Sequence, residues 1–187
     1  DTYTYSGSEA QPSVSVFLGD ILLEESDYVL TYSDNINAGT ASVTVKGRNN
    51  YEGSVTANFT ITKIDLSDAS IIISDSPVYT GQAIEPDMLV LLDDAVLAES
   101  VYTVSYENNT DAGTATVTVQ GTGNYEGTAS EVFTILPADL KDAELTIAED
   151  SFTYNGTAFT PEFTVRLGET LLKENDYTVS CSGNRDA

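Results

Sequence analysis

The sequence repeats itself with a fixed period, and this repeat constrains the fold more than any other feature. Three Tyr-x-Gly triplets begin at Tyr5, Tyr79 and Tyr154, which are spaced by 74 and 75 residues. Two further sets keep the same register: Pro12, Pro86 and Pro161, and Tyr28, Tyr102 and Tyr177. A period of this length is typical of an array of small domains. Catalytic sites are usually single, whereas surfaces and spacers can be multiplied, so the repeat favours a structural or binding role.

The period divides the 187 residues into two units of about 75 residues and a shorter third. We predict repeat 1 over residues 1–63, repeat 2 over 64–137 and repeat 3 over 138–187. Repeat 1 lacks a counterpart of the first strand of repeat 2, and repeat 3 lacks counterparts of its last two strands. An unpaired edge and an open core are liabilities. We therefore expect further residues or neighbouring chains to cover the incomplete repeats.

The residues are typical of short β-strands separated by tight turns. Valine, isoleucine, threonine and tyrosine dominate, and apolar and hydroxyl side chains alternate over residues 13–16, 40–45 and 55–61. Each segment therefore has one apolar face, which predicts two sheets packed about 10 Å apart. The strands expected in repeat 2 lie near residues 69–73, 78–79, 87–91, 96–97, 102–106, 114–119 and 129–135. Hairpin turns are expected at residues 18–20, 92–94 and 167–169, and positive φ at Gly53 and Gly127.

The net charge of −23 excludes several classes of partner. Such a chain repels phosphate backbones and anionic lipid surfaces, so we expect no nucleic-acid binding and no membrane insertion. No apolar run is long enough to cross a membrane, and residues 1–4 do not resemble a signal peptide. The one cysteine, Cys181, occupies the repeat position of Tyr32 and Tyr106, which predicts a packing role.

Catalysis is not expected from these residues. The chain has no histidine, which excludes a Ser-His-Asp triad and histidine-based metal sites. Carboxylates are plentiful, but none stands out as a pair placed across a cleft, as a glycosidase requires. We therefore predict that the chain is not an enzyme.

Calcium is the one metal that the acidic residues bring into consideration. Asp65 and Asp68 recur as Asp139 and Asp142 at the predicted repeat junctions, and acidic and amide residues also cluster at residues 34–37. Calcium takes six to eight oxygen ligands, so two acids per junction are too few without further donors. Turn formation by Asp and Asn explains the same residues. No cofactor is therefore expected, and calcium remains the alternative.

The repeated pattern resembles a known family. It combines Tyr-x-Gly, Asn-Ala-Gly-Thr-Ala-x-Val-Thr-Val-x-Gly, Asn-Tyr-x-Gly and Phe-x-Ile, which repeat 1 carries at residues 5–7, 37–47, 50–53 and 59–61. In this respect the chain is similar to bacterial immunoglobulin-like tandem repeats of cell-surface and secreted proteins, mostly of Gram-positive bacteria. The resemblance implies an all-β fold of tandem immunoglobulin-like β-sandwich domains, each of two antiparallel sheets. It brings no catalytic residues.

The expected roles of the repeated residues are structural. We expect Tyr28, Tyr102 and Tyr177 in core or corner positions, because an aromatic ring before a strand can pack while its hydroxyl stays polar. The expected function is a non-catalytic spacer, stalk or adhesive segment outside a bacterial cell. Its partners would be neighbouring repeats, with a cell-surface glycan, a host protein or homotypic assembly through the incomplete ends as further partners. The alternative is a carbohydrate-binding or accessory module of a larger glycosidase or adhesin, which predicts exposed aromatics grouped in one repeat only.

Overall fold

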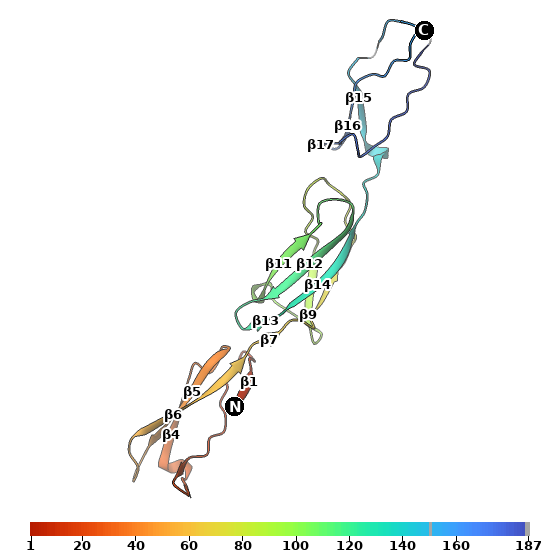
Figure 1. Ribbon diagram of the computed structural model, residues 1–187. Helices are drawn as coiled ribbons and strands as arrows, with labels where there is room; N and C mark the ends of the chain where they lie inside the picture. The colour runs from red at the N-terminus through yellow and green to blue at the C-terminus, as the bar shows by residue number, and fades with distance from the viewer. Residues whose placement is uncertain (150, 186–187) are drawn as a thin grey trace. The chain divides into compact units, whose positions relative to one another are not determined.

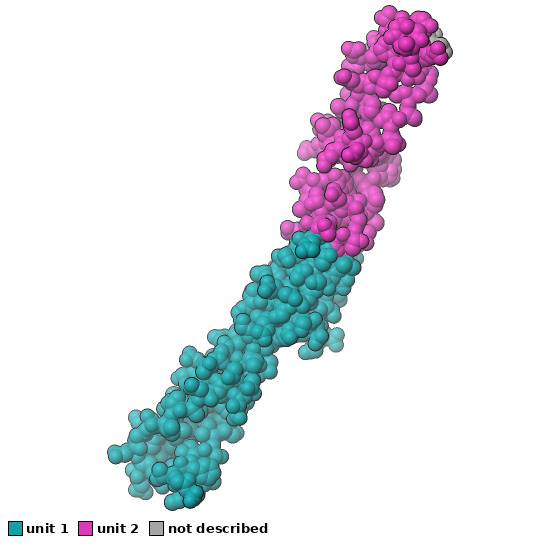
Figure 2. Space-filling model, in the orientation of Figure 1, with its two compact units in different colours: residues 1–74, 87–107, 116–132 teal, residues 75–86, 108–115, 133–187 magenta. Residues whose placement is uncertain are grey.

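The computed structural model describes residues 1–149 and 151–185, and its regular structure there is β-strand with three short 3-10 helices (Figure 1). The predicted all-β fold class is confirmed. Ala187, the predicted end of repeat 3, lies outside the described residues. Two compact units are present: unit 1 holds residues 1–74, 87–107 and 116–132, and unit 2 holds 75–86, 108–115 and 133–187 (Figure 2). Because this division crosses repeat 2, the boundaries of the repeats stay a prediction.

Repeat 1 lies within unit 1 and has a four-stranded sheet in the order β1-β6-β5-β4. These strands span Thr2–Thr4, Ser54–Thr62, Gly39–Gly47 and Tyr28–Ser33. The short hairpin of β2 (Phe17–Leu18) and β3 (Ile21–Leu22) and the 3-10 helix η1 (Glu25–Asp27) complete the repeat. Its core consists of buried Ala41, Phe59 and Ile61. The Tyr3 and Phe59 rings meet edge to face, with their centroids 5.7 Å apart.

The first strand of repeat 1 corrects the expectation of purely antiparallel sheets. Strand β1 pairs with β6 in parallel, with Thr2 opposite Thr60 and Thr4 opposite Thr62. The same parallel contact recurs in unit 2 as a bridge between Val78 and Leu136. In both repeats the residues just before the Tyr-x-Gly triplet therefore run parallel to the end of the last strand.

The part of repeat 2 in unit 1 contains two three-stranded sheets, ordered β10-β9-β8 and β11-β12-β14. The strands of the first sheet are β8 (Ser70–Ile73), β9 (Met88–Leu92) and β10 (Ala95–Val96). The second has β11 (Tyr102–Glu107), β12 (Gly113–Gly121) and β14 (Thr128–Ile135), of which β12 and β14 continue into unit 2. Two short strands, β7 (Ile64–Asp65) and β13 (Tyr125–Glu126), and the 3-10 helix η2 (Glu99–Val101) were not predicted.

One predicted strand of repeat 1 is wrong. Residues 13–16 form no strand, although Val14 and Val16 are half-buried and the serines beside them are exposed. The counterpart segment in repeat 2 begins β9, which is held in a ladder by β8 with Ile71 opposite Val90. Residues 13–16 alternate as a strand does, but the one backbone bond that the described residues give them runs from the Leu23 N–H to Val16 O at 2.9 Å and extends the β2–β3 hairpin.

Unit 2 contains the one sheet of repeat 3, ordered β15-β16-β17. Its strands span Glu144–Ile147, Phe163–Leu167 and Thr170–Leu171, and the 3-10 helix η3 (Leu140–Asp142) precedes them. Residues 177–182 are the counterpart of β11 but form no strand.

The predicted hairpin turns are present in all three repeats. In each, the residues that flank a two-residue turn pair with one another: Leu18 with Ile21, Leu92 with Ala95, and Leu167 with Thr170. Asp93 and Asp94 both have positive φ, of 50° and 64°, as the hairpin geometry demands. Gly53 and Gly127, for which positive φ was expected, have φ of 85° and 78°.

Each repeat also contains an asparagine that ties a turn to a residue 25 positions earlier. The side-chain Nδ2 donates to the backbone oxygen of that residue, and the backbone carbonyl oxygen of the asparagine accepts from the backbone N–H of the same residue. The pairs are Asn35 with Ala10, Asn109 with Ile84, and Asn184 with Phe159, with side-chain bonds of 3.0, 2.9 and 2.5 Å. Asn35 is only 8% exposed, so this bond replaces water at a buried amide. The sequence had indicated no more than a turn at this position.

We expect Asn35→Ala to lower the free energy of unfolding of repeat 1 by about 1–3 kcal/mol, because it leaves a half-buried carbonyl without its donor. Urea denaturation with a probe in repeat 1 measures the change. The matched control is Asn58→Ala, an exposed position on β6, which should change the free energy by no more than about 0.5 kcal/mol. Equal losses in the two variants would contradict the role of Asn35.

Candidate functional site

The predicted calcium residues act in turns. Asp65 Oδ1 accepts from the Ser67 backbone N–H at 2.9 Å, and Asp139 Oδ1 accepts from Lys141 N at 2.9 Å. Asp139 also pairs with the Lys141 ammonium at 3.2 Å, while Asp68 and Asp142 are exposed. Among the described residues, no group of three or more His, Cys, Asp or Glu side chains could hold a metal ion. That no cofactor binds stays a prediction, and calcium at these four residues stays its alternative.

The repeated tyrosines lie directly after the polar corners of each repeat. Tyr28 and Tyr102 begin β4 and β11 and are buried, and Tyr177 is half-buried, with its ring centroid 6.0 Å from that of Phe163 in an edge-to-face arrangement. Burial, with a smaller contribution from the nearby Glu99 carboxylate, raises the pKa of Tyr102. Cys181 departs from its expected packing role, because it is exposed. Its counterparts, Tyr32 and Tyr106, lie in β4 and β11, which pair with β5 and β12. Residues 177–182 form no strand.

Main-chain, side-chain and aromatic contacts join repeats 1 and 2, and this joint lies wholly within unit 1. Strand β7 follows β6 after a single residue and pairs in parallel with β13, with Ile64 opposite Tyr125 (Figure 1). The Ile64 N–H donates to Asn124 O at 3.0 Å and the Leu66 N–H donates to Glu126 O at 2.8 Å. The segment that links the two repeats is thus held by main-chain hydrogen bonds to the body of repeat 2.

Asn124 fastens this joint to repeat 1. Its Oδ1 accepts from the Ala38 backbone N–H at 2.9 Å, and its Nδ2 donates to Asn37 Oδ1 at 3.0 Å. Asn124 lies in the loop of repeat 2 that ends at Gly127, whereas Asn37 and Ala38 lie in the turn between β4 and β5 of repeat 1. One side chain therefore bonds to two consecutive residues of the neighbouring repeat.

Aromatic and apolar contacts complete the joint. The Tyr5 and Tyr125 rings meet edge to face, with centroids 6.0 Å apart and an interplanar angle of 72°, a geometry that such pairs favour. Leu66, immediately after β7, is 0% exposed. The linker is therefore anchored by burial as well as by hydrogen bonds, and its freedom to swing is small.

Asp65 and Gly127 fit closely together in the joint. The Ser67 backbone N–H, and secondarily its side chain, lower the pKa of Asp65 by bonding to the carboxylate. This group therefore favours the folded state above its ordinary pKa, and the contribution is lost as the pH falls through the lowered value. A Cβ placed on Gly127 would collide with Asp65 Oδ1, whereas a Cβ on Gly53, the counterpart in repeat 1, would meet no atom within 4 Å.

The sequence analysis missed the joint, although one signal for it was present. Asn50 and Asn124 occupy the same repeat position, and the Asn-Tyr-x-Gly pattern indicated a turn at both. Asn50 is exposed and Asn124 is half-buried. The sequence pattern within one repeat does not reveal that its Asn-Tyr-x-Gly loop contacts the preceding repeat. This arrangement offers no catalytic chemistry; it fixes two domains to each other.

Comparison with known proteins yields one structural similarity. No protein-family model matches the chain, and no curated protein matches it. A solved structure of a protocadherin gammaB7 EC3-6 cis-dimer is similar at 15% identity and a TM-score of 0.29. The similarity covers 88% of this chain and 54% of the protocadherin chain, so this chain spans about half of that chain's length. At this TM-score the likeness carries no argument about function.

The described residues contain no helix with the length and hydrophobicity of a membrane span.

We expect Gly127→Ala to destabilise the joint more than Gly53→Ala destabilises the matching loop of repeat 1. Both substitutions place alanine at positive φ, which costs about 1–2 kcal/mol. Gly127→Ala adds the collision with Asp65 Oδ1, which must rotate away and give up its bond from the Ser67 N–H. Chemical denaturation of both variants measures the difference. Equal losses would show that the close fit of Gly127 and Asp65 has no energetic weight.

Proposed function

We propose that this chain is a non-catalytic spacer or adhesive segment of a bacterial cell-surface or secreted protein, built from immunoglobulin-like repeats that are fixed to each other by side-chain and main-chain contacts. The observation that carries the proposal is the joint in unit 1, where Asn124, the β7–β13 ladder and the Tyr5–Tyr125 pair bind two repeats together. A binding or catalytic domain can function on a flexible linker. A spacer needs defined joints, because a freely swinging linker would not set a distance.

The charge of the chain supports the same proposal. With 30 acidic and 7 basic residues, copies of the chain repel one another at the distances where screening by salt is incomplete. Such a surface keeps closely spaced copies apart. It also suits a segment that presents another domain rather than one that binds anionic partners itself.

The stiffness of the joint can be measured directly by pulsed electron paramagnetic resonance. Spin labels at the exposed positions Thr31→Cys and Thr103→Cys, in a Cys181→Ser background, report the distance between β4 and β11. We expect one narrow distance distribution, because the joint allows little swing. Asn124→Ala should broaden it, because the bonds to Asn37 and Ala38 are lost.

The matched control for the spin-label experiment is Asn50→Ala. It removes the same amide from the exposed counterpart loop and should leave the distribution unchanged. A broad distribution in the parent chain would contradict the proposed spacer. An equal effect of both alanine variants would contradict the role of Asn124.

One observation favours the alternative of a carbohydrate-binding module. Phe152, Tyr154 and Phe159 of repeat 3 gather around a cavity of about 360 Å³ that Arg185 also lines. The Phe152 and Phe159 rings lie 4.8 Å apart, and Tyr154 is 63% exposed. Repeats 1 and 2 have alanine or isoleucine in place of Phe159. Of the three aromatics only Phe159 is specific to repeat 3, since Tyr3 and Tyr5 of repeat 1 stand at the positions of Phe152 and Tyr154.

A glycan array with the full chain tests this alternative, with Tyr154→Ala as the variant. Under the spacer function we expect no glycan above background and no difference between the two proteins. A glycan that binds the parent and loses at least about tenfold in affinity with Tyr154→Ala, which is about 1.4 kcal/mol, would establish the binding module instead. Tyr51→Ala, a half-buried tyrosine of repeat 1, is the control.

A further inference from the structure

The outer face of one sheet in repeat 2 carries apolar side chains. In the sheet β10-β9-β8, Ile71 and Val90 lie opposite each other, face the core and are 7% and 1% exposed. The next pair along these strands, Ile72 and Leu89, is 48% and 50% exposed. Because successive side chains of a strand point to opposite faces, this second pair lies on the face away from the core.

Leu91 and Val96 extend this pair across all three strands of the sheet. They lie opposite each other on β9 and β10, and Leu91 shares a face with Leu89, two residues before it. Val96 is 61% exposed and Leu91 is half-buried. We call the four residues Ile72, Leu89, Leu91 and Val96 the outer patch. Single exposed apolar residues are common on any protein, but a contiguous patch marks an interaction surface.

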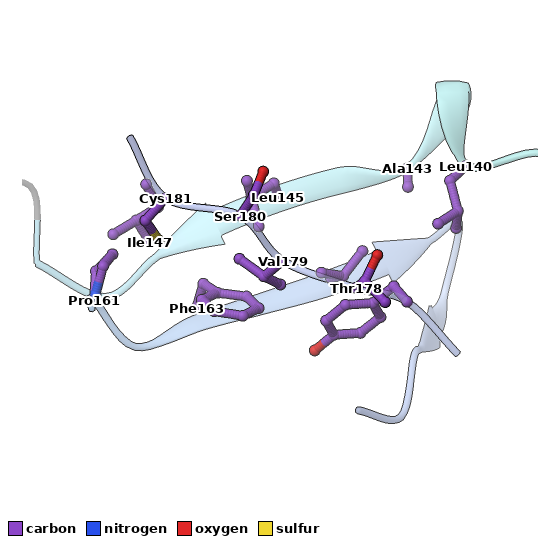
Figure 3. Close-up of a pocket in the computed structure, with 12 residues that line it drawn as sticks. Leu140, Ala143, Leu145, Ile147, Pro161, Phe163, Thr178, Val179, Ser180 and Cys181 are labelled. Carbon is purple, nitrogen blue, oxygen red and sulfur yellow. The ribbon is translucent and has the colours of Figure 1, made fainter. Parts of the chain in front are cut away.

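Repeat 3 shows that the fold does not require this apolar face. The residues of repeat 3 at the positions of Ile72, Leu89 and Leu91 are Thr146, Thr164 and Arg166. The apolar residues of its sheet lie on the other face, where Leu145, Ile147 and Phe163 line a cavity of about 460 Å³ (Figure 3). The outer patch is therefore specific to repeat 2 and is not a by-product of building the sheet.

Acidic residues border the outer patch, and repeat 2 has no basic residue to offset them. Asp87 lies just before β9, two residues from Leu89, and is exposed. Asp93 and Asp94 form the turn at the other end of β9 and are also exposed. Residues 64–137 contain no lysine or arginine. The outer patch is thus an apolar surface in a negative field, and this combination decides which partner can cover it.

We infer that the outer patch binds a basic protein segment in which apolar side chains are flanked by lysine or arginine. The apolar side chains of the segment cover Ile72 and Leu89, which removes apolar surface from water. Its cationic side chains pair with Asp87, Asp93 and Asp94, which speeds the encounter and rejects acidic partners. This inference goes beyond the spacer function, because it gives one repeat of the chain a partner of its own.

Charge disfavours the other occupants of this surface. A second copy of the chain brings the same three carboxylates to the contact, so two outer patches repel each other when they meet. An anionic lipid surface is repelled for the same reason. A neutral apolar ligand gains nothing from the carboxylates. The inference is independent of the spacer function, since no residue of the joint belongs to the outer patch.

Titration calorimetry of the full chain with a short amphipathic peptide of leucine and lysine tests the inference. We expect saturable binding, with the largest NMR shifts at the methyl groups of Ile72, Leu89 and Val96. The affinity should fall by at least about tenfold from about 0.1 M to about 1 M salt, because the screening length shortens from about 10 Å to about 3 Å. The matching peptide of leucine and glutamate should not bind.

The deciding variant combines Ile72→Thr with Leu89→Thr, which gives repeat 2 the residues of repeat 3 without changing the charge. We expect the affinity for the leucine–lysine peptide to fall by at least about tenfold, because apolar contact area is lost. Val132→Thr is the matched control, since Val132 is 59% exposed on β14 of the other sheet, and it should change the affinity by less than about twofold.

Two results would overturn the inference. Equal affinity of the parent and the double variant would show that charge alone holds the peptide. A parent chain that dimerises in sedimentation, while the double variant stays monomeric, would identify a second copy as the occupant. Should the double variant fold poorly, Val96→Thr on the neighbouring strand repeats the test and should weaken binding by at least about threefold.

Discussion

An apolar sheet face must be covered, and most differences among the three repeats follow from whether a hairpin is there to cover it. Where β5 and β6 or β12 and β14 are present, the inward side chains are buried and the neighbouring strand forms. Where the described chain has no counterpart, the same residue types stay exposed and the neighbouring segment has no ladder. Burial of apolar area and completion of backbone hydrogen bonds therefore act together, because one hairpin provides both.

The joint in unit 1 applies the same physics between repeats. Strand β7 is only two residues long, too short to be stable alone, yet it is fixed because Leu66 is buried beside it and Asn124 bonds across to the preceding repeat. None of these contacts is strong by itself in water, where a hydrogen bond contributes only about 1 kcal/mol net. Their effect is to order a linker of few residues, whose conformational entropy is small at the outset. A few weak contacts are therefore enough to fix the linker, as a structural function of the joint requires.

The sequence predicted the fold well because the repeat aligns three independent copies of each strand and turn. Alternation located the long strands, and the hairpin at Asp93 and Asp94 followed from its alignment with the turns at residues 18–20 and 167–169. The parallel pairing of β1 was missed, since alternation carries no information about the direction of a partner. The joint was missed for a related reason: Asn50 and Asn124 share the pattern Asn-Tyr-Glu-Gly, which does not reveal that only Asn124 contacts a turn of another repeat. Cys181 was misplaced because its expected packing partners belong to strands absent from repeat 3.

The asparagine corner is intact in every repeat, repeat 3 included. Asn184 holds Phe159 as Asn35 holds Ala10, so the corner does not require a finished sandwich. Closing a loop of 25 residues has a modest entropic cost compared with pairing strands from opposite ends of a domain. In a chain that emerges residue by residue from a ribosome or a secretion channel, each repeat would then have its corner set before its last two strands appear. Vectorial folding of this kind limits the time during which one half-made domain can mispair with the next, a hazard for arrays of near-identical copies.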